Sequence, residues 1–185
     1  MKPVPAARGG RGRLAGCLVS TVVSVVLSMP EPAPAAEALH CVLRGPASVV
    51  VGAPVMLRFS VTNRGGEALN VLEWNTPFEG WFGAYVGVTH DGVELPFRGP
   101  MLKRGDPAAD DYLRFGAGQT RRAAVDLALP FDLSLPGLYR VQPRITLHDV
   151  TGAAGKGRSR AEHRARPLPC NALDVRVLPA RAGPT

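Results

Sequence analysis

The residues of this chain that could do chemistry are four histidines, three cysteines and a group of aspartates. His40, His90, His148 and His163 could ligate a metal, but they are scattered and none belongs to an H-E-x-x-H pattern. A catalytic zinc ion needs three protein ligands brought together. No G-x-S-x-G sequence offers a nucleophilic serine. We therefore expect no catalytic residue, no metal site and no cofactor, and we predict that the chain is not an enzyme.

Two further patterns could indicate ligand binding. Asp106, Asp110 and Asp111 could suggest calcium, but they lack the glycine-containing frame of twelve residues that an EF-hand uses. Arg104-Gly105-Asp106 spells an integrin-binding tripeptide, although three residues carry little information. We interpret the aspartates as part of a solvated acidic loop and the tripeptide as a chance match.

The N-terminus has the features of a secretory signal peptide. Basic residues precede an apolar stretch over 14–27, which is shorter than the roughly 20 residues that a membrane span needs, and small residues follow at 33–36. We therefore expect residues 1–35 to be removed by cleavage after Ala35 or Ala36, and the mature protein to be secreted or periplasmic. We expect no membrane-spanning segment, because no second apolar stretch is long enough.

Two cysteines, Cys41 and Cys170, remain once the signal peptide is removed. An even number of cysteines in an exported chain favours a disulfide over two free thiols. The bridge would close a loop of about 130 residues, to which the chain-entropy model assigns roughly 4 to 5 kcal/mol. If the first and last strands lie side by side, as they can in immunoglobulin-like folds, the bridge would connect the two ends of the domain.

The formal net charge of +7 is concentrated in two places, the signal peptide and the segment 156–166. Between Ala36 and Val150 the chain has 11 Lys and Arg residues against 12 Asp and Glu residues. The basic segment could bind polyanions. However, no aromatic residues are interleaved that could stack on bases, so we expect no nucleic acid partner and interpret the segment as a solvated loop.

Strict alternation of apolar residues dominates the rest of the chain, as is typical of strands with one face on a core. It is clearest where Val55, Leu57, Phe59 and Val61 alternate with more polar residues. Turn residues separate such runs every 8 to 12 residues or so, which is typical of a two-sheet sandwich. We predict an all-β fold, a single immunoglobulin-like antiparallel β-sandwich of about 7–8 strands. The expected strands cover 55–62, 69–74, 85–89, 93–97, 112–115, 120–127, 138–147 and 173–177.

Two local signals support this fold, and they help to place the domain boundaries. Asp91-Gly92 between apolar runs predicts a β-hairpin, and Tyr139 after Gly137 is typical of a tyrosine corner. The sequence specifies no oligomeric state. We expect the sandwich core over 37–149, a basic flexible loop over 150–168, the last strand over 169–179 and a disordered tail over 180–185.

Two segments are candidates for binding a partner. Residues 74–82 contain four aromatic residues, broken by proline and glycine, that cannot all lie on one strand face. Either Trp74 and Phe82 close the end of the core, or Phe78 or Trp81 is exposed as a binding anchor. Residues 101–107 form a long loop, which either connects two strands or carries function. The candidate partner-binding residues are Trp74, Asn75, Thr76, Pro77, Phe78, Trp81, Phe82, Lys103 and Arg104.

Several of these motifs occur together in one known family. The motifs are V-L-E-W-N-T-P-F-E-G (71–80), Asp91-Gly92, G-P-M-L-K-R-G-D-P (99–107), Asp111-Tyr112 and F-D-L-S-L-P-G-L-Y-R-V (131–141). From Leu43 to Gln142 the chain resembles the N-terminal prosegment of peptidyl-Lys metalloendopeptidases of the deuterolysin type. That resemblance implies an immunoglobulin-type sandwich placed before a zinc protease domain, whose H-E-x-x-H motif this sequence lacks.

The resemblance implies a binding function without catalysis. The leading hypothesis is a prosegment-like domain that binds a secreted lysine-specific metalloprotease in trans, as an inhibitor or folding assistant, with Lys103 in a substrate-like pose. The alternatives are an adhesion or scaffold module of the periplasm or cell exterior, since immunoglobulin-like sandwiches host many functions, and a relic of a truncated protease.

Overall fold

The computed structural model describes Met1 and residues 37–180, and this part of the chain contains β-strands and two 3-10 helices but no α-helix. The expected signal peptide with its cleavage site, and residues 181–185 of the expected tail, lie outside the described residues. No helix in the described part is long and apolar enough to cross a membrane. The elements are β1 (Leu39–Arg44), β2 (Ser48–Val50), β3 (Met56–Asn63), β4 (Leu69–Leu72), β5 (Val86–His90), β6 (Val93–Glu94), η1 (Ala109–Asp111), β7 (Tyr112–Phe115), β8 (Thr120–Asp126), β9 (Gly137–Pro143), β10 (Ile145–Leu147), β11 (Val150–Gly152), η2 (Arg160–Glu162), β12 (Arg166–Leu168) and β13 (Leu173–Leu178).

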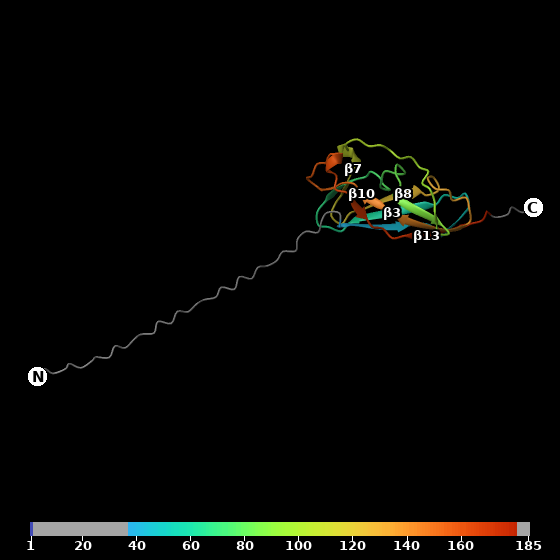
Figure 1. Cartoon of the computed structure of the whole chain (residues 1–185), viewed down its shortest axis with the longest axis horizontal. Helices are drawn as coiled ribbons and strands as arrows, with labels where there is room; N and C mark the ends of the chain where they lie inside the picture. Colours follow the sequence, from blue (N-terminus) through green and yellow to red (C-terminus); the bar gives the residue numbers. More distant parts are fainter. Residues whose placement is uncertain (2–36, 181–185) are drawn as a thin grey trace, which may run out of the picture. The chain divides into compact units, whose positions relative to one another are not determined.

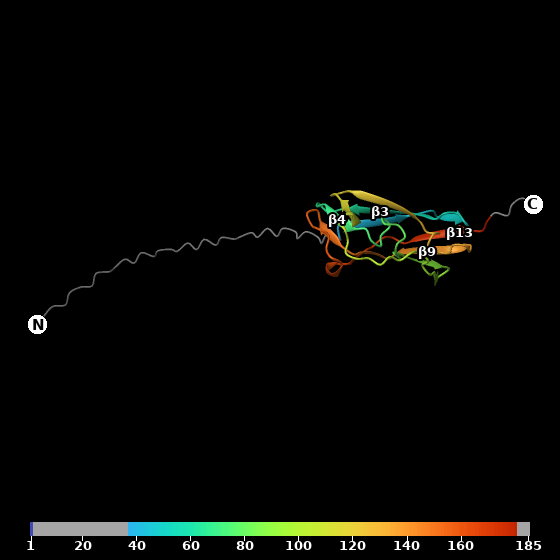
Figure 2. The same cartoon turned by 90° about the horizontal axis from the view of Figure 1, so that it is seen from above.

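The strands form two layers that face each other across the core (Figure 1). One layer contains the sheet β1-β3-β8 and the other contains β2-β13-β9-β5-β6 (Figure 2), and β11-β4-β7 and β10-β12 are separate, smaller sheets. Figure 2 shows β3 and β4 in one layer and β9 and β13 in the other. Every strand pair in the described part is antiparallel except β2 with β13, which is parallel. The fold is thus the expected all-β, immunoglobulin-like sandwich, with one parallel pair that the sequence did not indicate.

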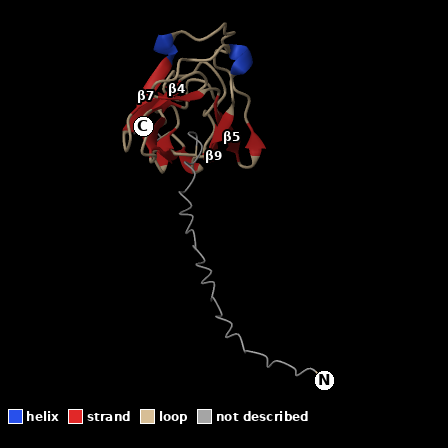
Figure 3. Ribbon diagram, turned by 90° about the vertical axis from the view of Figure 1, so that its left-hand side faces the viewer, coloured by secondary structure: helices blue, strands red, loops and turns tan. Residues whose placement is uncertain are grey.

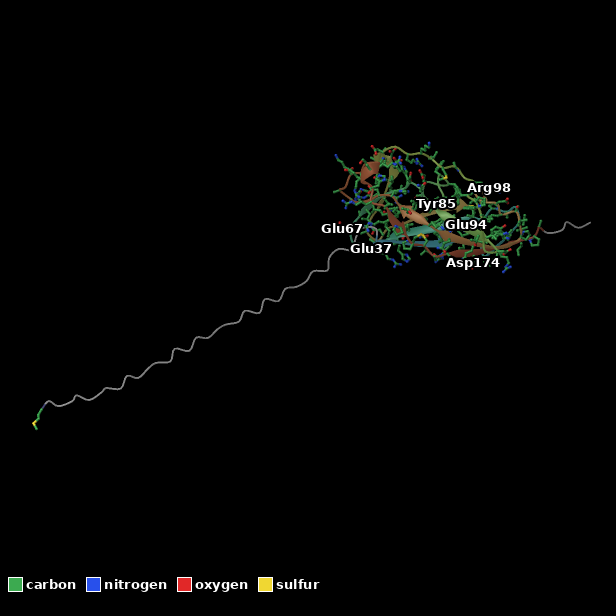
Figure 4. All side chains as sticks on the ribbon, in the orientation of Figure 1. Glu37, Glu67, Tyr85, Glu94, Arg98 and Asp174 are labelled. Carbon is green, nitrogen blue, oxygen red and sulfur yellow. A yellow bond between two sulfur atoms is a disulfide. The ribbon has the colours of Figure 1, made fainter. Side chains whose placement is uncertain are left out.

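The alternation in β3 explains how the core forms. Leu57, Phe59 and Val61 are at most 1% exposed, because successive side chains of a strand point to opposite faces and these three share the inner one. Tyr85, just before β5 in the opposite layer, meets the Phe59 ring edge to face, with 6.2 Å between the centroids. In Figure 4 Tyr85 lies in the middle of the domain, whereas Glu67 lies near one end. The aromatic contact therefore joins the two layers at the centre of the sandwich.

The two local signals produce the turns that they predict. Asp91 and Gly92 have positive φ values of 47° and 88° and connect β5 to β6 as a two-residue hairpin, with His90 paired to Val93. The hydroxyl of Tyr139 donates a hydrogen bond of 2.8 Å to the carbonyl oxygen of Leu135. A tyrosine corner makes this same bond to the backbone a few residues upstream.

The predicted disulfide joins Cys41 to Cys170, whose Cα atoms are 4.9 Å apart. It does not connect neighbouring strands of one sheet, because Cys41 is in β1 of one layer and Cys170 precedes β13 of the other. Beside the bridge, Asn171 accepts a hydrogen bond from the backbone N–H of Leu43 (2.9 Å) and donates one to its carbonyl oxygen (3.0 Å). The bridge and this asparagine therefore connect the two layers.

The structure has more and shorter strands than the seven or eight that were expected. The expected strand 138–147 is divided into β9 and β10 after Pro143, because proline has no N–H to donate to a ladder. The chain that pairs with it is also divided, into β12 and β13. Val141 pairs with Leu173 and Ile145 pairs with Leu168, so the unpaired stretch between β12 and β13 is one residue longer than the stretch opposite it. Periodicity alone does not reveal such an interruption of the pairing.

The segment 150–168, which was expected to be a basic flexible loop, contains regular structure. Within it β11 pairs with β4, β12 pairs with β10, and η2 forms a short turn of helix. The side chain of Asp149 is fully buried, and its Oδ1 lies 2.9 Å from Nη1 of Arg158. The hydroxyl of Tyr112 donates to the other carboxylate oxygen, also at 2.9 Å. A buried carboxylate needs such partners, and Arg158 supplies the charge.

Candidate functional site

The segment after β4 forms a tight turn that fixes the direction of its side chains. The Thr76 hydroxyl donates a hydrogen bond of 2.6 Å to the carbonyl oxygen of Glu73, and the Thr76 N–H bonds the same oxygen at 3.1 Å. Asn75 has a φ of 55°, in the left-handed region that asparagine tolerates better than most residues. Thr76 is only 1% exposed, and Pro77 is also buried. Thr76 and Pro77 therefore shape the turn from inside and offer little surface to a partner.

The aromatic residues of this segment point to different places. Trp74 is 6% exposed, as the first alternative expected, but Phe82 is 39% exposed and does not close the core. Trp81 is half-buried: its ring stacks on Tyr85 at 4.7 Å, and its Nε1 donates to the carbonyl oxygen of Asp126 at 2.8 Å. Phe78 packs edge to face on Phe115 at 5.8 Å. The exposed aromatic residue is thus Phe82, in a shallow groove of about 590 Å³.

The second candidate segment lies against the first, although the two were predicted separately. The guanidinium group of Arg104 forms an ion pair with Glu79, whose side chain is only 8% exposed. The same guanidinium lies 5.2 Å from the centroid of the Trp74 ring, which is within the range of a cation–π contact. The other carboxylate oxygen of Glu79 accepts the N–H of Asn75 at 2.9 Å. Glu79 therefore holds both segments in one arrangement.

Where the two segments meet, they line a pocket of about 450 Å³. One wall contains Trp74 and Asn75 from the first segment and Leu102, Lys103 and Arg104 from the second. Lys103 is exposed at this wall, and Leu102 is 49% exposed.

The other wall of the pocket comes from residues that sequence reasoning did not select. They are His148, just after β10, and Arg160 and His163 in and after η2. The backbone N–H of Arg160 donates to Asp106 at 2.8 Å, which attaches η2 to the second segment. Figure 3 shows η1 and η2 on the same side of the domain. No local pattern around these three residues indicates a site, because only the pairing of β12 and the attachment of η2 bring them to the pocket.

Two buried nitrogen atoms at this pocket have no hydrogen-bond partner among the described residues. They are Nε1 of Trp74 and Nε2 of His163, whose rings meet edge to face at 6.3 Å. Leaving a buried polar group unpaired costs about 1–3 kcal/mol, and functional sites are one place where such groups persist.

His148 is held in a defined state by its neighbours. Burial, followed by the nearby His163, lowers the pKa of His148 below its ordinary value of 6.5. Its Nε2 lies 3.1 Å from Nδ2 of Asn75, which is a donor, so this nitrogen is the acceptor of a neutral imidazole. An added Cβ at Gly83 would lie 2.8 Å from the Asn75 Cγ, so glycine at 83 leaves room for this bond.

The depressed pKa of His148 predicts a loss of stability in mild acid. As pH falls below about 6.5, the unfolded chain binds a proton at His148 that the folded protein does not bind. We expect the free energy of unfolding to fall between pH 7 and pH 5, by less than about 1.4 kcal/mol per pH unit because solvent screens a half-buried group. Above this window the histidine is neutral in both states and has no effect.

Urea denaturation at several pH values tests this prediction. His148→Gln, which keeps an acceptor but does not titrate, should flatten the dependence on pH, and His40→Gln, at an exposed position on β1, is the matched control. An equally steep dependence in His148→Gln would contradict the assignment.

The described residues contain no group of three His, Cys, Asp or Glu side chains that could hold a metal ion. Of the three aspartates that could suggest calcium, Asp106 accepts the N–H of Arg160, and Asp111 accepts the N–H of Ala108 at 2.7 Å. What the pocket offers is a set of hydrogen-bond donors and positive charges, which suits binding.

Comparisons with known proteins find relatives for about half of the chain. No family model matches it. The chain is 33% identical over 88 residues to a neutral protease 2 homolog of Arthroderma gypseum, and the aligned region covers 46% of this chain and 25% of that protein. It is 32% identical over 89 residues to a probable neutral protease 2 homolog A of Trichophyton rubrum, and this aligned region covers 47% of this chain and 25% of that protein. The chain thus spans about a quarter of the length of these relatives.

Among solved structures, a CARDB domain from Pyrococcus furiosus in complex with di-metal ions covers 75% of this chain and 91% of its own, with a TM-score of 0.34 and 15% identity. The match to a beta-glucosidase from Listeria innocua covers 76% of this chain and 16% of the glucosidase chain, with a TM-score of 0.30 and 12% identity. Similarities this low carry no argument about function. The sequence relation is the informative one: part of this chain is related to part of proteins named as protease homologues.

Proposed function

We propose that this chain is an exported, non-catalytic binding domain that docks on a lysine-specific zinc metalloprotease in trans, in the manner of that enzyme's own prosegment. Export includes removal of residues 1–35, and the disulfide is compatible with an oxidising compartment outside the cytoplasm. Binding would either inhibit the protease or assist its folding.

One observation carries this proposal. The two motifs of the resemblance, 71–80 and 99–107, are separated by 18 residues in the sequence and meet at one pocket. Arg104 of one motif pairs with Glu79 of the other. The relation to neutral protease 2 homologues over about half of the chain supports the same reading.

Lys103 is the residue that we expect to contact the protease. It is exposed on the wall of the pocket, and the loop that carries it is attached to the domain through Arg104 and Asp106. A lysine fixed in this way resembles the residue beside which such an enzyme cleaves. It would enter the specificity pocket of the protease as a substrate lysine does.

The test is a titration of the purified, oxidised chain against a deuterolysin-type lysine-specific metalloprotease, following cleavage of a lysine peptide. We expect inhibition that depends on dose, and an inhibition constant at least about tenfold weaker for Lys103→Ala, which corresponds to roughly 1.4 kcal/mol. Lys156→Ala is the matched control, because Lys156 is also exposed but does not line this pocket.

The outcomes separate the parts of the proposal. Unchanged inhibition by Lys103→Ala would contradict the substrate-like pose of Lys103 but would be compatible with docking on the protease. No binding and no inhibition by the unaltered chain would remove the docking as well, and would favour a scaffold module or a relic of a truncated protease.

A further inference from the structure

The pocket between residues 74–75, 102–104 and η2 is rich in hydrogen-bond donors and poor in acceptors. The indole Nε1 of Trp74 can only donate, and it is buried without a partner among the described residues, in a side chain that is 6% exposed. Nε2 of His163 is buried in the same condition. Among the described residues no acceptor therefore reaches the indole N–H of Trp74, which is already removed from bulk water.

The charge of the lining is positive. Lys103, Arg104 and Arg160 contribute to the lining, and no carboxylate does. Arg104 is already neutralised by Glu79, but Lys103 and Arg160 form no ion pair among the described residues. The guanidinium group of Arg160 donates to the carbonyl oxygen of Arg104, which holds it beside the pocket. Two cations thus remain for a ligand.

The size and the apolar part of the lining indicate more than a small ion. A volume of about 450 Å³ lies in the range of pockets for organic ligands, about 300–1,000 Å³. The Trp74 ring and the Leu102 side chain supply apolar surface beside the donors. Such a site fits a carboxylate carried on a short aliphatic stem, with the oxygens at the donors and the stem on the rings.

We propose that this pocket binds the side-chain carboxylate of an acidic residue, glutamate in the first instance, presented by a polypeptide. Trp74 supplies a buried donor, and Lys103 and Arg160 supply charge. The pocket does not require a protease partner. Glutamate binding can therefore hold if docking on a protease fails, and docking can hold if glutamate binding fails.

The direct readout is the indole N–H signal of Trp74 in a proton–nitrogen correlation spectrum of the ¹⁵N-labelled, oxidised chain. The chain has two tryptophans, so Trp74→Phe assigns the signal by its disappearance. The probes are two blocked pentapeptides, Ac-Ala-Ala-Glu-Ala-Ala-NH₂ and the same peptide with Gln in place of Glu. We expect the Glu peptide to shift the Trp74 signal in a saturable manner, and the Gln peptide to bind at least about tenfold more weakly.

Variants of the chain locate the charge that matters. Arg160→Gln and Lys103→Gln should each lower the affinity for the Glu peptide by about five- to tenfold, because a partly desolvated charge pair is lost. Lys156→Gln makes the same change in net charge outside this pocket and should leave the affinity within about twofold. Equal weakening by all three variants would mean that only overall charge is involved, and would overturn the proposal.

Two further probes distinguish the source of the anion. A pentapeptide of alanine with a free C-terminus offers a terminal carboxylate, and inorganic phosphate offers an oxyanion without a stem. Tighter binding of either one than of the Glu peptide would overturn the side-chain assignment. Equal shifts with the Glu and Gln peptides, or no shift of the Trp74 signal with any of the probes, would overturn carboxylate binding altogether.

Discussion

Replacing both Cys41 and Cys170 with alanine is expected to lower the free energy of unfolding by about 4 kcal/mol, a larger loss than we expect from any other substitution proposed for this chain. The two cysteines are 129 residues apart in the sequence. In the chain-entropy model, a bridge that closes a loop of this length restricts the unfolded chain by roughly 4 to 5 kcal/mol. Alanine is the suitable replacement, because Cys41 is 4% exposed and a serine hydroxyl there would be buried.

Urea denaturation of the oxidised chain, the reduced chain and the double alanine variant measures this effect. The reduced chain and the variant should unfold at closely similar urea concentrations, well below that of the oxidised chain. The m-value is the internal control, since a change in it would mean that the compactness of the unfolded state had changed as well. A difference between oxidised and reduced chains smaller than about 1 kcal/mol would contradict the prediction.

Replacing Arg158 with methionine is expected to cost about 3 kcal/mol, the lower end of the range for breaking a buried ion pair. The carboxylate of Asp149 is fully buried and would lose the only cation within 4 Å among the described residues. Arg158 is 29% exposed, so water can reach the vacated position in part, and this places the expected loss at the lower end. The same carboxylate, after burial, contributes to raising the pKa of Tyr112 to about 12.

Thermal and urea unfolding of three variants test this expectation. Arg164→Met is the matched control, because Arg164 is an exposed arginine in the same segment, and it should change stability by less than about 0.5 kcal/mol. Combining Arg158→Met with Asp149→Asn removes the unpaired charge and should recover part of the loss. An equal, small effect of Arg158→Met and Arg164→Met would show that the ion pair contributes nothing to stability.

The elements that could be predicted from sequence are those with local signals. Alternation placed β3 to within one residue, and Asp91-Gly92 placed the hairpin between β5 and β6 because both positions need positive φ. The cysteines could be paired because only two remain after the expected signal peptide. In each case the signal lies in a few adjacent residues, or follows from a count.

The features that could not be predicted depend on contacts between distant residues. The segment 150–168 has the composition of a loop, and its structure depends on Arg158 meeting the buried Asp149 and on pairing with β4 and β10. Four of the residues that line the pocket, Trp74, Asn75, Lys103 and Arg104, were among the selected candidates, whereas those of the opposite wall were not. The first alternative expected Phe82 in the core, and the second expected Phe78 or Trp81 to be exposed, whereas Phe82 is the exposed ring and Trp81 is half-buried. Spacing in an irregular loop does not determine which ring faces inward.

The pairing of Arg158 with Asp149 has a consequence for the lifetime of the chain. Residues 156–166 hold one lysine and four arginines, a sequence that trypsin-like peptidases would cleave rapidly in an unstructured tail. Cleavage of a folded chain requires the segment to open locally, and the rate follows the population of the opened form. Because opening separates Arg158 from a buried carboxylate and releases β12 from β10, we expect the most basic stretch of the domain to be digested more slowly in the folded protein than in the unfolded chain.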